Sequence, residues 1–257
     1  MKKLTFIFLL TLVFVMVGCA EKVQDPYASF RNKTSTVIFN GGEKALANHD
    51  YSQAAQHFEA LDAIYPFGPY AQQGQLDIIY AYYRAGDEAS ASVAADRYIR
   101  LYPRGPRVDY AYYMKGIVGF TQGLSWLQKL TGTDPAPRDV STMQQSFSSF
   151  ATVAQLFPDS PYAEDSLVRM AYIRNLMANR EVLIAGFYLR RKAYVAAANR
   201  ASYVVQHFEG SPQTIQALAI MVQSYRSLGL DKMANDTYKI LRTNYPNAPE
   251  LAKLARA

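Results

Sequence analysis

The chain has 257 residues, of which 50% are hydrophobic and 19% are charged. This composition excludes wholesale disorder, and the length suits one domain or a short repeat array. A single cysteine, Cys19, excludes an intramolecular disulfide framework, and three histidines leave little material for a His-rich metal site.

The N-terminus has the pattern of a secretory signal. Lys2 and Lys3 precede an apolar run over residues 4–17, which is shorter than the roughly 20 residues of a membrane span but suits a signal-peptide core. Gly18 and Cys19 follow directly, and this arrangement resembles the lipobox of bacterial lipoproteins, although Met16 stands where that pattern usually has Leu. Residues 1–18 are therefore predicted to be a signal peptide that is cleaved before Cys19.

The lipobox resemblance implies a covalent lipid on Cys19, namely N-palmitoyl and S-diacylglycerol groups. An anchor with several acyl chains holds a protein firmly on a membrane. Ala20, rather than Asp, follows the cysteine, which resembles the pattern that permits export to the outer membrane. We expect residues 19–34, which are polar and contain Pro26, to be a tether, and the rest of the chain to be soluble and periplasmic.

The remainder of the chain repeats one short phrase: an aromatic residue, Pro, any residue, a small residue, Pro. Its copies are 37, 55, 51 and 37 residues apart, so the regular unit is slightly longer than a 34-residue tetratricopeptide repeat and two units carry insertions. In the copy at Phe208, Glu209 replaces the first proline. The five copies begin at Tyr65, Tyr102, Phe157, Phe208 and Tyr245.

Aligning the copies exposes three upstream columns with spacings of four and three residues, which place them on one helix face. The first column is small throughout: Ala54, Ala91, Ser146, Ala197 and Ala234. The second comprises Phe58, Ala95, Phe150, Ala201 and Tyr238, and the third Leu61, Tyr98, Val153, Val204 and Leu241. Prolines end these helices, and Gly86 and Gly229 end the helices before two of them. The fold is predicted to be an all-α solenoid of five tetratricopeptide-like helix-turn-helix repeats.

The irregular units divide the expected solenoid into two halves. The N-terminal half spans residues 35–142 and carries an insertion at 121–142, which holds the only tryptophan. The C-terminal half spans residues 143–257, and residues 177–192 predict helices extended beyond the repeat length. Such departures from a solenoid often shape the surface that a partner contacts.

Catalytic and cofactor motifs are missing from the sequence. It contains no Gly-rich phosphate loop, no GxSxG and no HExxH. Asp50 is expected to cap a helix, with His57 partly exposed, rather than to form a catalytic pair with it. We therefore predict no enzymatic activity, no metal and no non-covalent cofactor. Without the two lysines of the signal, the net charge falls from +6 to +4, which is too mild to favour nucleic acid.

The junction of the first two repeats, residues 65–87, is rich in tyrosine. Tyr combines apolar area with a hydroxyl that needs a partner, so this stretch predicts a groove for an extended peptide. The alternative is that most of these rings pack between helices, and Tyr80 and Tyr83 suit that reading at least as well. Tyr70, which follows Pro69, is the better candidate for binding.

Residues 60–87, ALDAIYPFGPYAQQGQLDIIYAYYRAGD, together with the lipobox and the repeats, resemble the BamD (ComL) family. Further matching stretches are YIRLYP at 98–103 and MKG at 114–116, whereas the resemblance is loosest beyond 210. Members of that family are lipoprotein subunits of the outer-membrane β-barrel assembly machinery, the BAM complex. The resemblance implies a non-enzymatic scaffold on the periplasmic side of the outer membrane.

The resemblance also implies partners. The C-terminal half would face a POTRA domain of the insertase BamA, where Asn199 and Arg200 match an Asn-Arg pair of the family. The N-terminal half would receive the C-terminal targeting strand of unfolded outer-membrane β-barrel proteins, and accessory lipoproteins such as BamC and BamE would join the complex. The substrate-facing residues carried over to this chain are Tyr65, Phe67, Tyr70, Gln73, Asp77 and Arg97.

Two other functions fit the sequence less well. A periplasmic adaptor for cell-wall or division proteins would need only the repeat fold, because function lives in sites and not in folds. DNA binding would need more basic charge than the mature chain carries, and would show strong salt dependence. Residues 65–87 together with the lipobox favour the assembly machinery over both.

Overall fold

The computed structural model describes residues 25–123 and 140–255, and every regular element in these ranges is a helix. Several sequence predictions fall outside the described residues. These are the signal peptide, the lipid on Cys19, residues 19–24 of the tether, and residues 124–139 of the insertion.

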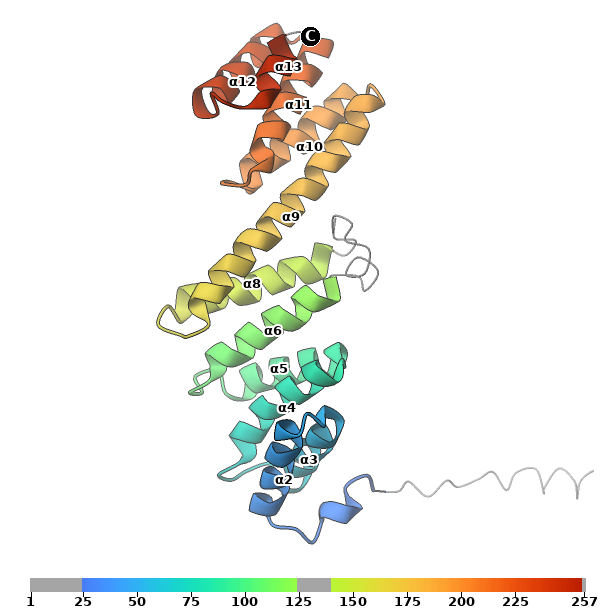
Figure 1. Ribbon diagram of the computed structural model, residues 1–257, viewed down its shortest axis with the longest axis vertical. Helices are drawn as coiled ribbons and strands as arrows, with labels where there is room; N and C mark the ends of the chain where they lie inside the picture. The colour runs from blue at the N-terminus through green and yellow to red at the C-terminus, as the bar shows by residue number, and fades with distance from the viewer. Residues whose placement is uncertain (1–24, 124–139, 256–257) are drawn as a thin grey trace, which may run out of the picture.

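Consecutive helices form five hairpins that stack one on the next (Figure 1). This arrangement confirms the predicted helical solenoid of five repeats. A short turn, η1 (Ala28–Phe30), precedes the first hairpin, and α13 (Pro249–Ala255) follows the last. The hairpins are α2 (Ser35–Ala47) with α3 (Tyr51–Ile64), α4 (Ala71–Ala85) with α5 (Glu88–Leu101), α6 (Val108–Gly123) with α8 (Val140–Leu156), α9 (Ala163–Arg190) with α10 (Tyr194–His207), and α11 (Gln213–Ser227) with α12 (Asp231–Asn244).

The three predicted columns form the buried face of the second helix in each hairpin. All five members of the first column and all five of the third are at most 2% exposed. In the second column four members are buried, while Tyr238 in the last hairpin is half-buried. The repeat pattern of the sequence is therefore the packing pattern of the core.

Side-chain sizes across each hairpin complement one another in the second column. Where this column has phenylalanine, the opposite helix has glycine: a Cβ built on Gly42 would lie 2.6 Å from the Phe58 ring, and one on Gly116 would lie 2.6 Å from the Phe150 ring. Where the column has Ala95, the bulky Ile79 shares its hydrophobic cluster. Close helix approach thus depends on matched pairs and not on one residue type.

The recurring phrase forms the same double turn in every linker between hairpins. The backbone N–H of each leading aromatic residue donates to the carbonyl four residues earlier, at 2.8–3.0 Å. The carbonyl of the small residue three positions further on accepts from the backbone N–H three residues after it, in the first turn of the next helix, at 3.0–3.3 Å. Phe208 keeps the C-cap conformation of the other leading aromatic residues (φ −123°, ψ 50°, against φ −128°, ψ 62° at Tyr65) although Glu209 follows it instead of proline. The proline is therefore not required for this conformation.

The turns within four hairpins also share one geometry, with a left-handed residue followed by a long backbone hydrogen bond. Gly86 (φ 81°) and Gly229 (φ 70°) occupy the left-handed position, as predicted, but His49 (φ 61°) and Lys192 (φ 60°) occupy it in the other two hairpins. The next residue donates to the carbonyl five positions back, at 2.9–3.0 Å, which is the Schellman pattern. Asp50 then caps α3, as expected, by accepting from the Gln53 N–H at 3.0 Å.

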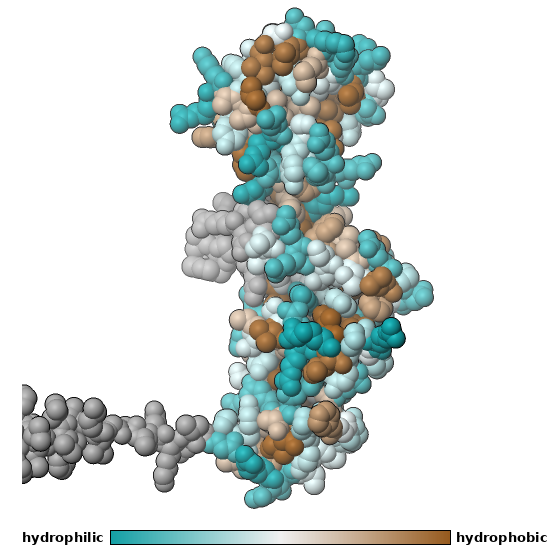
Figure 2. All heavy atoms as spheres, turned by 180° about the vertical axis from the view of Figure 1, so that it is seen from behind, coloured by the Kyte–Doolittle hydropathy of each residue, from teal (hydrophilic) through white to brown (hydrophobic). Residues whose placement is uncertain are grey.

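The fourth hairpin differs from the others because α9 has 28 residues. Its first half packs on α8 and its second half on α10 and α11, so it links the lower hairpins to the upper ones in Figure 1. The predicted extension over 177–192 belongs to this helix, which ends at Arg190. On the face seen in Figure 2, hydrophobic side chains lie in small groups between polar ones, in keeping with helices that bury their apolar stripes.

Candidate functional site

A pocket of about 430 Å³ opens between α3, α4 and α5 in the first two repeats. Its apolar lining includes Phe58, Ile78 and Val93, and Val93 is 65% exposed. Gly74 on α4 lets this helix approach α3 closely, since a Cβ built on it would lie 2.7 Å from the Leu61 side chain. Tyr27, from the segment before η1, lines one side, so the N-terminal segment forms part of the site.

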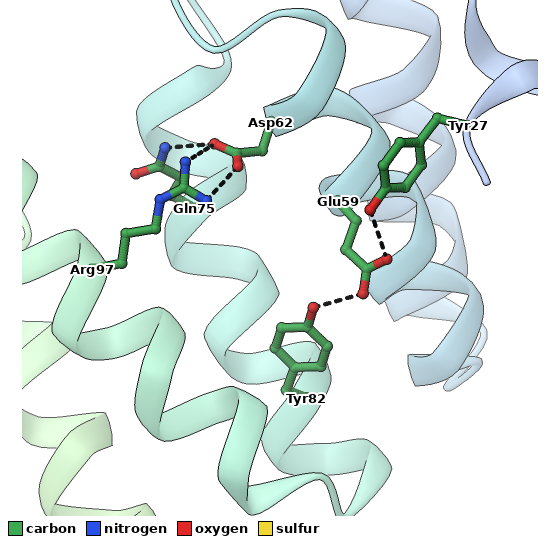
Figure 3. Close-up of polar contacts among 6 residues, drawn as sticks. All are labelled: Tyr27, Glu59, Asp62, Gln75, Tyr82 and Arg97. Carbon is green, nitrogen blue, oxygen red and sulfur yellow. Dashed lines mark hydrogen bonds and ion pairs between the residues drawn. The ribbon is translucent and has the colours of Figure 1, made fainter. Parts of the chain in front are cut away.

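Two phenols in this pocket point at one carboxylate (Figure 3). Tyr82 on α4 donates to Glu59 Oε1 at 2.6 Å, and Tyr27 donates to Glu59 Oε2 at 3.4 Å. Burial, followed by the hydrogen bond and charge of Glu59, raises the pKa of Tyr82. Burial also raises the pKa of Tyr27. Both tyrosines therefore stay protonated near neutral pH and act as hydrogen-bond donors.

A second polar group lies on the other side of the pocket (Figure 3). Arg97 on α5 forms an ion pair with Asp62 on α3, and the Gln75 side-chain amide donates to the same carboxylate at 2.8 Å. The Arg97 side chain is 49% exposed and that of Asp62 is 19% exposed, so the guanidinium lies at the rim. Of the six residues predicted for substrate binding, Arg97 is the one that lines this pocket.

The predicted aromatic residues lie in the linker before α4. Tyr65 donates its hydroxyl to the Lys33 carbonyl at 2.9 Å. Tyr70 stacks on Phe39 with a centroid distance of 4.7 Å and an interplanar angle of 19°. Both rings pack against the hydrophobic core of the first hairpin, which includes Phe58 and Leu61. This favours the alternative that these two tyrosines pack between helices and do not bind a peptide. Phe67, by contrast, is 88% exposed at the linker tip.

Gln73 and Asp77 lie on a different face of α4 from the pocket. Gln73 donates to Asp77 Oδ1 at 2.8 Å, while Asp77 Oδ2 is buried without a hydrogen-bond partner among the described residues. Burial, reinforced by Glu43 and opposed by Arg107, raises the pKa of Asp77 to about 7. The structure thus brings Gln73 and Asp77 together but separates them from Arg97.

The predicted insertase-facing residues lie on α10. Arg200 forms an ion pair with Glu181 on α9 at 2.9 Å, and Arg180 pairs with the other oxygen of the same carboxylate at 2.9 Å. The Glu181 side chain is only 9% exposed, whereas that of Arg200 is 48% exposed. Arg200 therefore both holds a buried acid and reaches solvent, and its neighbour Asn199 is exposed.

Glu59 and Asp62 carry the polar chemistry of the pocket, and the sequence did not single them out. In the sequence, Asp62 is one of several acids spread along the helices of the first two repeats, with Asp77, Asp87 and Asp96. The available signal is their spacing of three residues, which places both on one side of α3. Tyr27 was assigned to the tether, and nothing in the local sequence links it to a residue 32 positions later.

No group of three or more His, Cys, Asp or Glu side chains in the part of the chain that the structure describes is placed to hold a metal ion. None of the helices in the described ranges is long and apolar enough to cross a membrane.

The stacked hairpins and their surface pockets define a helical-repeat binding scaffold. A family model described as YfiO, outer membrane lipoprotein, matches residues 31–240. The chain belongs to this family.

Three relatives illustrate how far the similarity extends, and each is named outer membrane protein assembly factor BamD. The relative from Haemophilus influenzae is 32% identical, over 98% of each chain. That from Pasteurella multocida is 35% identical, over 95% of this chain and 92% of the relative. That from Neisseria meningitidis serogroup B is 35% identical, over 83% of this chain and 80% of the relative.

Proposed function

We propose that this chain is a non-enzymatic scaffold of the outer-membrane protein assembly complex. The family match and the shared name of its relatives support this role. The signal sequence and Cys19 support a lipid anchor, with N-palmitoyl and S-diacylglycerol groups, that holds the body on the periplasmic side of the outer membrane.

The pocket between α3 and α5 is the proposed receptor for the C-terminal strand of unfolded β-barrel proteins. Such strands are amphipathic and end in a carboxylate. The apolar wall of Ile78 and Val93 suits the apolar side chains of the strand. Arg97 lies at the rim with half of its side chain exposed, so a terminal carboxylate can share the guanidinium with Asp62. Phe67, which is exposed in the linker between α3 and α4, offers a further apolar side chain in the same half of the chain.

The C-terminal half is the proposed docking surface for a POTRA domain of BamA, with Asn199 and Arg200 at the contact. Arg200 supports this role because its guanidinium is half exposed while Glu181 holds it in place. A positioned arginine loses little freedom when it binds a partner's acid. Accessory lipoproteins such as BamC and BamE are the further proposed partners.

The test is site-specific photo-crosslinking in the native membrane. A photo-reactive residue at Val93 is expected to capture the terminal strand of newly made β-barrel proteins. The control position is Leu156, which is equally exposed (69%, against 65% for Val93) but lies at the end of α8. Equal capture at both positions, or none at Val93, contradicts the receptor role. Mild-detergent purification that yields no POTRA-bearing insertase contradicts the scaffold role.

A further inference from the structure

A second groove lies between α8 and α10, with α9 as its floor. It consists of two adjoining cavities of about 400 and 40 Å³, which share Gln144 on α8, Met177 on α9, and Tyr203 and Phe208 at the end of α10. None of these elements contributes to the pocket of the first two repeats. The larger cavity is within the size range of ligand pockets.

The groove follows from the length of α9. Met177 packs against two hydrophobic clusters, one belonging to the lower hairpins and one to the upper hairpins. The groove therefore lies at the seam between these clusters, where a 28-residue helix replaces one of ordinary repeat length. Phe147 is half-buried and Tyr203 is 41% exposed, so aromatic surface faces the cavity from both sides.

The charge lining the groove is positive. Arg174 and His207 line the larger cavity, which has no acidic residue in its lining. The one acid of the smaller cavity, Glu181, is already paired with Arg180 and Arg200. Among the described residues, Arg174 has no ion-pair partner, and its Nε is buried without a hydrogen-bond acceptor. A buried cationic donor without a partner is costly, so this site favours a ligand that brings a carboxylate.

The Arg174 guanidinium lies beside the linker after α10. A Cβ built on Gly210 would lie 3.6–3.8 Å from the guanidinium atoms, so a side chain at this position would sit next to the arginine. Gly210 also has a φ of 74°, a conformation that favours glycine. The glycine therefore leaves the guanidinium open on this side.

We propose that this groove binds a short peptide segment of a partner protein in which an aromatic or aliphatic residue adjoins Asp or Glu. The apolar side chain enters between Phe147 and Tyr203 over Met177. The carboxylate accepts hydrogen bonds from Arg174, and the His207 ring lines the same cavity. The proposal concerns a site separate from the strand receptor and does not depend on it.

The test uses the purified full-length chain in detergent and a displayed library of random octapeptides. Peptides are selected on the unaltered protein and depleted on the Arg174→Glu variant. The enriched sequences are expected to pair Asp or Glu with an adjacent apolar residue. A synthetic peptide from that set is expected to lose about tenfold or more in affinity when Arg174→Glu is introduced, or when its acids are replaced by amides.

A second variant separates binding from folding. Ser148 on α8 lines the groove and is exposed, so Ser148→Trp fills the cavity without removing a buried contact, and it is expected to abolish binding. Arg242 on α12 is exposed and lines neither this groove nor the pocket of the first two repeats, so Arg242→Glu is expected to change the affinity less than about twofold. Helicity and the unfolding midpoint are measured for every variant. Peptides that do not distinguish Arg174→Glu, an enriched set without acids, or full affinity in Ser148→Trp overturns the proposal.

Discussion

Arg97 on α5 and Asp62 on α3 form a two-pronged ion pair that joins the first two repeats, with Nη1–Oδ2 and Nη2–Oδ1 distances of 2.5 and 3.1 Å. The two partners are not equivalent. Asp62 also accepts from Gln75, which is buried, whereas Arg97 is half exposed. The Asp62 carboxylate is thus largely buried between the two repeats, whereas the Arg97 guanidinium is accessible to solvent.

This asymmetry predicts different costs for removing either partner. Arg97→Ala is expected to lower the free energy of unfolding by less than about 1 kcal/mol, since the pair is screened by solvent. Asp62→Ala is expected to cost about 1–3 kcal/mol, because the buried Gln75 amide then loses its acceptor. Urea unfolding measures both. Asp62→Asn, which keeps an acceptor for Gln75, is expected to fall between them, and equal costs for the two alanine variants contradict this account.

Gly116 lies where α6 meets the Phe150 ring, and this contact predicts an overpacking effect. Gly116→Val is expected to destabilise the chain by about 1–3 kcal/mol, since its Cβ would approach a fully buried ring to 2.6 Å. Adding Phe150→Ala to Gly116→Val is expected to cost less than the sum of the two single changes, because the cavity accepts the new side chain. Strict additivity in thermal or urea unfolding contradicts the size-matching argument.

The hairpin turns allow a matched pair of glycine substitutions. Lys192 and Gly229 both have left-handed backbones, with φ of 60° and 70°. Lys192→Gly is expected to raise the free energy of unfolding by about 0.5–1 kcal/mol by relieving strain, and Gly229→Ala to lower it by about 1 kcal/mol. Thermal unfolding measures both, and two changes of the same sign contradict the assignment of these turns.

The repeat columns were predictable because solenoid packing imposes the same sizes at the same intervals along the chain. Every unit has a small residue in the column of Ala54 and an apolar residue in the column of Leu61, so alignment of the units alone identifies the buried face. The left-handed turns at His49 and Lys192 were not predictable, since no glycine marks them. The backbone hydrogen bonds around each turn stabilise the left-handed conformation of His49 and Lys192, although both residues carry a side chain.

The pocket was less predictable than the fold, because its polar groups come from segments far apart in the sequence. Residues 65–87 predicted a tyrosine-rich groove, yet Tyr65 and Tyr70 pack on the first hairpin, and of the tyrosines in this stretch Tyr82 alone lines the pocket. The order of residues along α4 does not reveal which side chains face α3 and α5. The contribution of Tyr27 depends on how the N-terminal segment folds back, which no local pattern encodes.

Asp77 predicts a pH dependence of stability. Its pKa is about 7 in the folded chain, so between about pH 4 and 7 the folded state retains a proton that the unfolded chain has lost. Stability from this group is therefore present at low pH and is lost as pH rises through 7. Asp77→Asn removes the effect, and its free energy of unfolding relative to the unaltered chain is expected to rise by about 1–2 kcal/mol between pH 5 and 8.

The groups that face Asp77 are Gln73 on the same helix, Glu43 on α2, and Arg107 and Tyr110 at the start of α6. Urea unfolding at several pH values measures the effect. Asp96→Asn is the control, because Asp96 pairs with Lys115 at 2.6 Å instead of facing another acid. Parallel pH profiles for the unaltered chain and Asp77→Asn contradict this prediction.

Arg200 has two roles in the proposed scaffold, and a charge swap with Glu181 separates them. Arg200→Glu alone sets a second carboxylate beside Glu181, whose side chain is only 9% exposed. It is expected to lower the free energy of unfolding by about 1–3 kcal/mol, less than for a fully buried pair because Arg200 itself is half exposed. The double change Glu181→Arg with Arg200→Glu restores opposite charges across α9 and α10. More than half of the lost stability is expected to return.

Docking to BamA should respond differently to the same swap. If Arg200 contacts an acid of the POTRA domain, the double variant still presents a negative charge at position 200 and is expected to lose co-purification of the insertase as fully as the single variant does. If binding to BamA instead requires only a well-folded α9–α10 hairpin, the double variant is expected to regain the insertase together with its stability. Recovery of the insertase by the double variant would therefore make Arg200 a structural residue and remove it from the proposed interface, whereas continued loss from a chain of near-normal stability supports a direct charge contact there.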